Sequence, residues 1–377
     1  MSLIAELATR RDALLTTLAT LVNYESPSTE KAAVDTLSAW LQAQCRALGA
    51  EVTVHPQQHY GDLTVARWYG ADQSRSPLLV LTHIDTVWPL GTIRERPFRI
   101  EGERAFGPGI FDMKASVAMM LEAIRWLRAN NRLQRSIVWL ITTEEEVGSP
   151  VSRPLIEAFA REAAYVLCLE PPTPPRGALK TARKGVGMFS LRVRGRAAHA
   201  GADPDRGVSA IVELAHQILA IQRLADPTQG TTINVGVIGG GTRPNVVAAE
   251  AWAQIDVRVT TLAEAERITQ ALMTLRPVLE GTELNVTGGI NRPPMERTPV
   301  IAAAFARAQE IGRELGITLE ESATGGGSDG NFTAALGVPT LDGLGCPGNG
   351  AHAVDEHISI PGLLERTALL IALLERL

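Results

Sequence analysis

The chain has 377 residues, of which 45% are hydrophobic and 20% charged, a composition typical of globular proteins that excludes disorder, collagen and coiled coils. At about 150 residues per domain, this length predicts two or three domains. The 36 basic and 41 acidic residues give a net charge of −5. We therefore expect no nucleic-acid partner and no anionic-membrane surface, because both need a basic excess.

Two helices and two strands are predicted at the N-terminal end. Residues 1–22 have apolar side chains interrupted by charges at helical spacing, which indicates an amphipathic helix and not a signal peptide. A second amphipathic helix is predicted over residues 32–48. Strands are predicted over residues 51–55 and 63–68.

Three short apolar runs then follow without alternation, at residues 77–82, 136–142 and 165–169. Such runs are typical of strands that are covered on both faces. Residues 113–127, between the first two runs, have apolar positions at helical spacing. Strands that alternate with helices predict an α/β sheet with parallel pairs.

The pattern changes after about residue 183. Residues 188–193 and 253–259 alternate strictly between apolar and polar, which predicts an antiparallel sheet with one open face. Residues 209–219 and 263–275 are predicted helices. Together these segments predict a separate, inserted α+β module.

Two further helices, over residues 300–315 and 361–374, have enough apolar residues to complete the first domain. The predicted fold is therefore α/β: a mixed, largely parallel sheet flanked by helices, with an inserted α+β domain of antiparallel sheet and two helices. We expect the catalytic domain over residues 1–183 and 294–377, and the inserted domain over residues 184–293.

Candidate site residues begin at the end of the first apolar run, where His83 and Asp85 follow directly. Side chains alternate along an extended chain, so both project to the same side. Alone, this pattern is more typical of a structural histidine. Asp112 follows a turn containing Gly107 and Gly109 and precedes a helix, where an acidic cap is common.

More carboxylates follow the next two strands. Glu144, Glu145 and Glu146 follow the second run, and Glu170 follows the third. Ligands of open α/β sheets bind outside the carboxyl ends of the strands. Histidine and carboxylate side chains are the ligands of Zn²⁺ and similar ions. His352 lies in a Gly-rich loop and could supply a second imidazole.

At these and further motifs the sequence resembles the co-catalytic zinc metallopeptidases, a family that includes bacterial glutamate carboxypeptidase, acetylornithine and succinyl-diaminopimelate deacylases, and aminoacylase. The matching stretches occur in order along nearly the whole chain. They are LTHIDTV at 81–87, GPGIFDMKA at 107–115, TTEEEVGS at 142–149, LEP at 169–171, GRAAHAG at 195–201, GGGSDGNF at 325–332 and GAHAVDE at 350–356.

The resemblance implies two divalent metal ions, with Zn²⁺ expected and Co²⁺ or Mn²⁺ as alternatives. The implied ligands are His83 and Glu170 for one ion, Glu145 and His352 for the other, and Asp112 as the bridge between them. Glu144 would be the general base, which takes a proton from water and passes it to the leaving nitrogen. Asp85 would hold the tautomer of His83. The family also predicts a cis peptide bond after Asp112.

The resemblance further implies contacts to the substrate. His199, which the residues alone would place in an ordinary surface loop, would donate to the substrate carbonyl. It would do so from a partner subunit, because the inserted module forms the homodimer in such enzymes. Arg258 would bind a carboxylate, with a surface pair to Asp256 as the alternative. The other implied contacts are Asn245, Arg292, Thr324 and Gly327.

The expected reaction is cleavage of an amide bond that releases an amino acid with a free α-carboxylate, as in glutamate carboxypeptidases. The alternative within the family is an N-acyl-amino-acid deacylase. The substrate is in either case a small molecule. One departure concerns the glutamate pocket, where the family has a lysine and a serine and this chain has Ala178 and Lys180.

A serine hydrolase is a further alternative. Residues 326–330 fit G-x-S-x-G around Ser328, and Asp342 and His352 follow in the order expected of an α/β-hydrolase. Such a serine needs a buried strand before it. Residues 320–324 do not predict one, which disfavours this alternative.

Two weaker alternatives remain. Residues 236–241 resemble a dinucleotide fingerprint, but Pro244 lies where a helix should begin, so we expect a turn or bulge. A non-catalytic protein that binds metal and acyl amino acids is also conceivable. The retained Glu144 disfavours it, because a pure binder needs no base.

The sequence also predicts a cytoplasmic protein. It contains no apolar run of about 18 residues, so no transmembrane segment is expected. Its three cysteines are odd in number and far apart, which disfavours disulfides and fits a reducing compartment. They are Cys45, Cys168 and Cys346.

Overall fold

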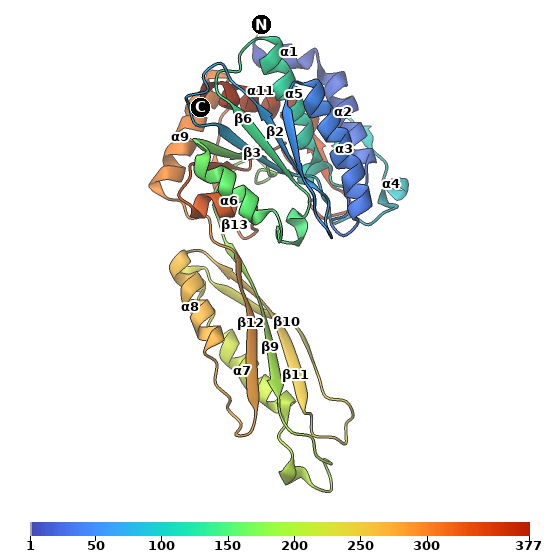
Figure 1. Ribbon diagram of the computed structural model, residues 1–377, viewed down its shortest axis with the longest axis vertical. Coiled ribbons are helices and arrows are strands. Elements are labelled where there is room, and N and C mark those ends of the chain that lie inside the picture. The colour runs from blue at the N-terminus through green and yellow to red at the C-terminus, as the bar shows by residue number, and fades with distance from the viewer. Residues whose placement is uncertain (1) are drawn as a thin grey trace. The chain divides into compact units, whose positions relative to one another are not determined.

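The computed structural model describes residues 2–377, which form two compact units (Figure 1). The first unit comprises the chain up to residue 182 together with residues 297–324 and 328–377. The second comprises residues 183–296 and 325–327. The boundaries predicted from the sequence, after residues 183 and 293, thus differ from those of the units by one and three residues.

A sheet of eight strands forms the centre of the first unit, in the order β1-β2-β6-β3-β7-β14-β8-β13. β3 runs parallel to β6 and β7, and β14 runs parallel to β7. β2 is antiparallel to both β1 and β6, and β8 is antiparallel to β14. This confirms the predicted mixed, largely parallel sheet. The strands are β1 (Glu51–His55), β2 (Leu63–Trp68), β3 (Leu78–His83), β6 (Ile137–Thr142), β7 (Tyr165–Cys168), β8 (Leu179–Arg183), β13 (Glu321–Thr324) and β14 (Thr340–Asp342).

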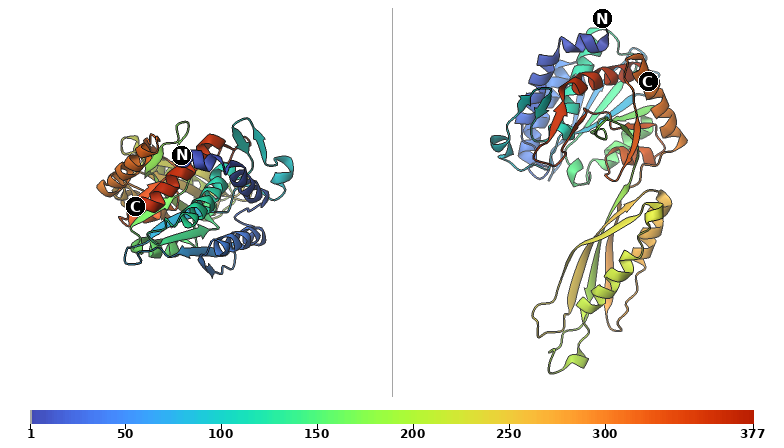
Figure 2. Two further views of the ribbon diagram at one scale, coloured as in Figure 1. Left: turned by 90° about the horizontal axis from the view of Figure 1, so that it is seen from above. Right: turned by 180° about the vertical axis from the view of Figure 1, so that it is seen from behind.

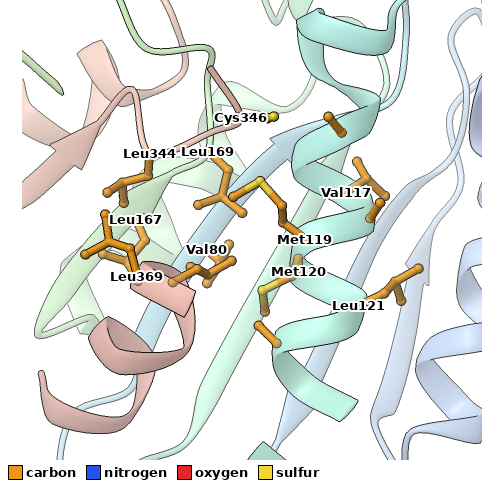
Figure 3. Close-up of a cluster of buried hydrophobic side chains, with 14 of the residues drawn as sticks. Val80, Val117, Met119, Met120, Leu121, Leu167, Leu169, Leu344, Cys346 and Leu369 are labelled. Carbon is orange, nitrogen blue, oxygen red and sulfur yellow. The ribbon is translucent and has the colours of Figure 1, made fainter. Parts of the chain in front are cut away.

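Helices cover both faces of this sheet. On one face lie α5 (Ala115–Ala129) and α11 (Ile360–Arg376), which pack against each other and against the apolar side chains of β3 and β7 (Figures 2 and 3). On the other face lie α6 (Arg153–Glu162) and α10 (Gly330–Ala335). Because β3, β6 and β7 are buried along most of their length, their carboxyl ends are rigidly placed.

The remaining helices of this unit lie around the sheet. One of them differs from the sequence prediction. The predicted single helix at the N-terminus is broken at residues 9 and 10; its first residue, Met1, lies outside the described residues. The helices are α1 (Leu3–Ala8), α2 (Arg11–Asn23), α3 (Lys31–Ala47), α4 (Thr92–Glu95) and α9 (Pro299–Glu314). A second correction is β13, a strand that the sequence of residues 320–324 did not predict.

A small four-stranded sheet, in the order β15-β16-β5-β4, holds two loops side by side. β15 and β16 form a hairpin whose loop is residues 350–356, and β16 pairs with β5, which directly precedes residues 107–113. The strands are β4 (Arg99–Glu101), β5 (Arg104–Phe106), β15 (Gly348–Asn349) and β16 (His357–Ser359). The loop that contains His352 thus lies beside the loop that contains Asp112.

The second unit is an antiparallel sheet, in the order β10-β11-β9-β12, with two helices on one face. Buried and exposed residues alternate along β9 and β11, as their sequences predicted. A bulge interrupts β10 between Val235 and Val237, which confirms the bulge predicted there. The elements are β9 (Gly185–Arg194), β10 (Thr232–Gly240), β11 (Glu250–Val259), β12 (Glu283–Arg292), α7 (Ala210–Gln222) and α8 (Leu262–Met273).

The two ends of this unit are paired with each other. Arg183 and Met295 form an antiparallel bridge, in which each main-chain N–H donates to the other's oxygen, at 2.9 and 3.0 Å. The chain therefore enters and leaves the second unit at adjacent points.

Within residues 2–377, no helix is long and apolar enough to cross a bilayer. Cys45, Cys168 and Cys346 are buried, and none of the three forms a disulfide bond.

The buried sheet predicts a large cost for a cavity at its centre. Leu167→Ala in β7 should lower the free energy of unfolding by about 2–5 kcal/mol, since it removes buried methyl groups and leaves a void. Urea titration of the metal-free protein measures this cost. Leu90→Ala, at an exposed leucine, should change it by less than about 0.5 kcal/mol. Equal effects of the two substitutions would contradict the assignment of the core.

Candidate metal centre

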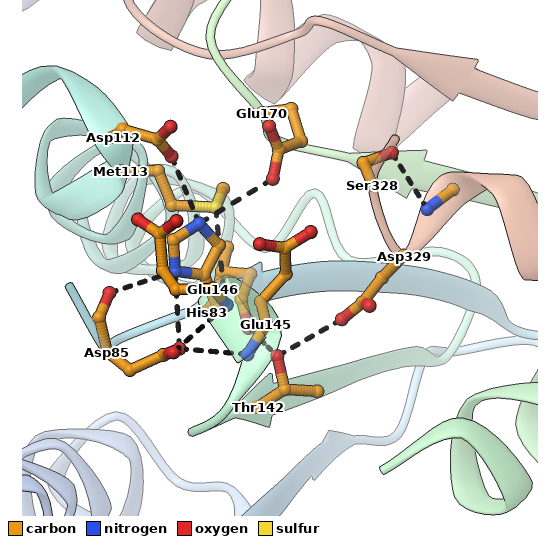
Figure 4. Close-up of polar contacts among 12 residues, drawn as sticks. His83, Asp85, Asp112, Met113, Thr142, Glu145, Glu146, Glu170, Ser328 and Asp329 are labelled. Atoms are coloured by element: carbon orange, nitrogen blue, oxygen red, sulfur yellow. Dashed lines mark hydrogen bonds and ion pairs between the residues drawn. The ribbon is translucent and has the colours of Figure 1, made fainter. Parts of the chain in front are cut away.

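The candidate site lies at the carboxyl ends of three neighbouring strands (Figure 4). His83 is the last residue of β3, and Glu170 comes two residues after β7. After β6 the chain forms a short 3₁₀ turn, Glu145–Val147. The prediction that these side chains gather at one edge of the sheet is therefore confirmed.

The first group of side chains is His83, Asp112 and Glu170. Their ligand atoms lie within 4.8 Å of one another. Nε2 of His83 is 3.0 Å from Oδ1 of Asp112 and 3.6 Å from Oε1 of Glu170. The peptide bond between Asp112 and Met113 is cis, as the family resemblance predicted.

The second group shares Asp112 and adds Glu146 and His352. Nε2 of His352 is 3.1 Å from Oε2 of Glu146 and 3.8 Å from Oδ2 of Asp112. Asp112 thus presents Oδ1 to one group and Oδ2 to the other. This is the arrangement that a carboxylate shared by two cations requires.

Asp85 accepts hydrogen bonds from both sides of the site, from His83 and from the turn that contains Glu145 and Glu146. Its main-chain oxygen accepts a hydrogen bond from Nδ1 of His83 at 3.0 Å, which leaves Nε2 without a proton in the neutral ring. Its carboxylate accepts from the hydroxyl of Ser28 at 2.7 Å. It also accepts from the main-chain N–H groups of Glu145 and Glu146, at 3.2 and 3.1 Å. The predicted contact between Asp85 and His83 is therefore present, and Ser28 is an addition that the sequence did not reveal.

The positions of the three consecutive glutamates correct the sequence prediction by one residue. Glu144, expected as the free base, is fully buried, and both of its oxygens accept main-chain hydrogen bonds: from Ser152 at 2.7 Å and from Thr143 at 3.1 Å. Glu146, and not Glu145, lies beside His352. The strand ends at Thr142 and a 3₁₀ turn follows, so strand alternation no longer determines where these side chains point.

Glu145 is half-buried on the same turn as Glu146. Figure 4 shows its side chain extending to the side of the turn where Asp112 and Glu170 lie. The geometry therefore differs from the expectation by one residue: Glu146 contacts His352, and Glu145 precedes it on the same turn.

The electrostatics of the two groups fit divalent cations. The hydrogen bond to Glu146 raises the pKa of His352 to about 9, although partial burial opposes this shift. Burial also disfavours a charged His83, but hydrogen bonds to Asp112 and Asp85 outweigh it and raise its pKa. Burial raises the pKa of Glu146. The carboxylates thus favour the charged form of both imidazoles, and metal cations would take the place of those protons.

Two of the expected substrate contacts lie on adjacent loops of the second unit. The main-chain N–H of Ala200, next to His199, donates to the oxygen of Asn245 at 3.0 Å. Nδ1 of His199 accepts from the N–H groups of Gly201 and Ala202, at 3.1 and 3.0 Å. In the neutral ring the proton is therefore on Nε2, which makes this exposed histidine a donor, as its expected role requires.

The other expected substrate contacts differ in how available they are. Arg258 donates to both oxygens of Asp256 at 3.0 Å, so the surface pair considered as its alternative is present. Arg292 is buried next to Gly327, both in the second unit. Thr324 is the last residue of β13 in the first unit. The roles of all four in substrate binding remain predictions.

The geometry around Ser328 contradicts the serine-hydrolase alternative. Ser328 is fully buried, and its hydroxyl donates to Oδ2 of Asp342 at 2.6 Å. His352, the expected partner of such a serine, instead contacts Glu146. Within residues 2–377, no hydrogen bond joins Ser328 to a histidine that would activate it.

Comparison with known proteins decides the family. Residues 79–376 match peptidase family M20/M25/M40. The chain is 31% identical to carboxypeptidase G2 of Pseudomonas sp. (strain RS-16) over 367 residues, which cover 94% of this chain and 86% of that protein. This chain belongs to peptidase family M20/M25/M40.

Two further relatives agree. Succinyl-diaminopimelate desuccinylase of Herminiimonas arsenicoxydans is 29% identical over 305 residues, which cover 75% of this chain and 80% of that protein. The crystal structure of aminopeptidase PepT from Bacillus cereus ATCC 10987 has the same fold, with a TM-score of 0.78 at 24% identity, over 97% of this chain and 98% of that one. The predicted family is confirmed, and with it an enzyme of the metallopeptidase or amidohydrolase type.

The one-residue correction predicts opposite results for two neighbouring variants. Glu146→Gln should bind fewer metal ions than the wild type, because it loses a charged side chain of the second group. Glu144→Gln should retain the wild-type metal content and lose about 1–3 kcal/mol of stability, since a buried acceptor of main-chain N–H groups is replaced. Elemental analysis and urea titration measure the two effects. Loss of metal from Glu144→Gln, with none from Glu146→Gln, would instead make Glu144 a ligand and contradict this correction.

Proposed function

We propose that this protein is a two-metal hydrolase, with Zn²⁺ as the expected ion, that cleaves an amide bond to release an amino acid with a free α-carboxylate. The observation that carries this proposal is the position of Asp112, with one carboxylate oxygen toward each group of side chains. In this proposal His83 and Glu170 bind one ion, and Glu146 and His352 bind the other.

Divalent ions held by these residues would lower the pKa of water and would stabilise the negative charge that develops on the substrate carbonyl. Glu145 is proposed as the general base, which takes the proton from water and donates it to the leaving nitrogen. Its position supports this role: its main-chain N–H is held by Asp85, and Glu146 follows it on the same turn. Asp85 would therefore both position the general base and fix the tautomer of His83.

A carboxypeptidase-like reaction is preferred over N-acyl deacylation. The match to carboxypeptidase G2 covers more of the chain, at higher identity, than the match to the desuccinylase. Lys180 is one candidate for binding the amino acid that is released. It lies on β8 opposite Asp342, and its charge acts on Asp112. Where glutamate carboxypeptidases have a lysine, this chain has Ala178. Its own lysine, Lys180, lies two residues further along the chain.

Chelation should abolish hydrolysis of peptidyl and N-acyl amino acids, and Zn²⁺ should restore it. Glu145→Gln should lower kcat by about 10²–10⁴-fold while both ions remain bound, because only proton transfer is lost. Amino-acid release from a panel of substrates with C-terminal and N-acylated glutamate, aspartate and neutral residues gives the rates and the specificity.

Glu144→Gln is the matched control, and it should keep most of the wild-type activity per folded molecule. Activity that persists in the chelated enzyme would contradict the proposal. A metal-loaded wild type that hydrolyses nothing on the panel would instead favour a protein that only binds metal.

A homodimer formed through the second unit is also proposed. β10 lies at one edge of its sheet, where main-chain groups can pair with a second copy. Val237 and Ile238 near the end of β10, and Ile211, Val212 and Leu219 on the adjacent α7, are exposed apolar residues. Several exposed apolar side chains on neighbouring elements are typical of protein interfaces.

If His199 acts across this interface, two inactive variants should complement each other. A mixture of Glu145→Gln and His199→Ala should regain on the order of a quarter of wild-type activity after subunit exchange, since half of the dimers are mixed and each has one intact site. The rate of hydrolysis and the molar mass from light scattering measure the two aspects.

Adding Ile238→Lys and Leu219→Lys to both variants should prevent recovery and halve the molar mass. Leu262→Lys, at an exposed leucine on α8, is the matched control that should change neither. Full activity of His199→Ala by itself would rule out its substrate role. We also propose a cytoplasmic location, which the three free cysteines support.

A further inference from the structure

Glu356 is a buried carboxylate whose oxygens bind main-chain N–H groups and an indole, and no side chain of the two candidate metal groups. The residue is 2% exposed. Its Oε1 accepts hydrogen bonds from the main-chain N–H groups of Phe111 and Asp112, at 2.9 and 3.1 Å. Its Oε2 accepts from the N–H of Gly109 and from Nε1 of Trp88, both at 2.8 Å. Four donors therefore converge on one carboxylate.

These contacts join three segments of the chain at one point. Glu356 is the last residue of the hairpin loop 350–356, which also contains His352. Three of its donors belong to residues 109–112, the turn that ends in the shared carboxylate Asp112. The fourth, Trp88, follows β3 by five residues. The pairing of β16 with β5 brings the two loops together, and Glu356 then fixes one to the other.

The two candidate metal groups depend on this connection to different degrees. His83 and Glu170 are placed by the buried strands β3 and β7, and His83 is also held by Asp85. The side chain of His352 is 51% exposed, and its main chain has a φ of 61° within the hairpin loop. Its distance from Asp112 is thus determined by how the two loops are joined.

We propose that Glu356 is a positioning residue that sets the distance between His352 and Asp112, and so determines the affinity of the second group for its ion. This inference rests on the proposed two-metal function. It assigns to Glu356 no contact with metal or substrate. Residues that orient metal ligands in this way typically change metal affinity by about 10–100-fold when they are replaced.

Glu356→Gln is the direct test, because it keeps the size of the side chain and removes half of its acceptors. The carboxamide has one oxygen and one NH₂ group, so in either orientation it presents donors to two of the four N–H groups. We expect the loop of His352 to separate from residues 109–112. The cis peptide and the strand ends are not altered by the substitution.

The chain offers a matched control at Glu25. Its carboxylate also accepts two main-chain hydrogen bonds, from Gly91 and Ile93, both at 2.9 Å. Both Glu25 and Glu356 interact electrostatically with the buried ammonium of Lys114. Glu25→Gln therefore removes a similar carboxylate from the same surroundings without touching the loops of Asp112 and His352.

The measurement is calorimetric titration of Zn²⁺ into the metal-free full-length protein. The wild type should bind two ions. Glu356→Gln should bind the first with a Kd within a few-fold of the wild type and the second with a Kd raised about 10–100-fold. Excess Zn²⁺ should then restore kcat, because the catalytic groups are intact. Glu25→Gln should retain both wild-type affinities.

The possible failures are distinguishable. A wild type that binds no second ion would overturn the proposed function and this inference with it. Two unchanged affinities in a folded Glu356→Gln variant, or equal weakening of both, would overturn the inference alone. If circular dichroism shows that Glu356→Gln does not fold, Trp88→Phe, which removes one donor, should still weaken the second ion selectively, and an unchanged second affinity there would overturn the inference.

Discussion

Mutual repulsion among carboxylates at one edge of a buried sheet is the constraint on which this site depends. Within residues 2–377, two imidazoles lie within ligand distance of the three carboxylates Asp112, Glu146 and Glu170. Such a group is stable only if cations or protons neutralise it and if rigid elements hold it in place. The parallel strands supply the rigidity, because their side chains are buried on both faces and their ends cannot shift without disturbing the core.

Carboxylate side chains serve two distinct purposes within this small region. Glu146 and Glu170 face the candidate metal positions. Glu144, Asp85 and Glu356 face main-chain N–H groups and hold the loops that present the others. Hydrogen bonds to charged acceptors are among the stronger ones in proteins. The acidic motifs therefore contain both candidate metal ligands and residues that hold the loops in place. Only the surroundings of each carboxylate show which of these two roles it has.

Much of the fold could be predicted from the sequence, because burial determines its periodicity. The continuous apolar run of β3 and the alternation along β9 indicated strands covered on two faces and on one. The prediction failed where local geometry departs from regular periodicity. The 3₁₀ turn after Thr142 places Glu146 beside His352, where Glu145 was expected, and the short edge strand β13 has too few apolar residues to be recognised. Contacts between distant loops, such as those of Glu356, leave no local pattern at all.

The bridge between Arg183 and Met295 closes the second unit at its base. An insertion whose ends are hydrogen-bonded neighbours can be removed or exchanged by a short connecting turn, without rearranging the strands of the host sheet. Evolution could thus exchange one self-contained module while the strands that carry the candidate metal centre are inherited unchanged.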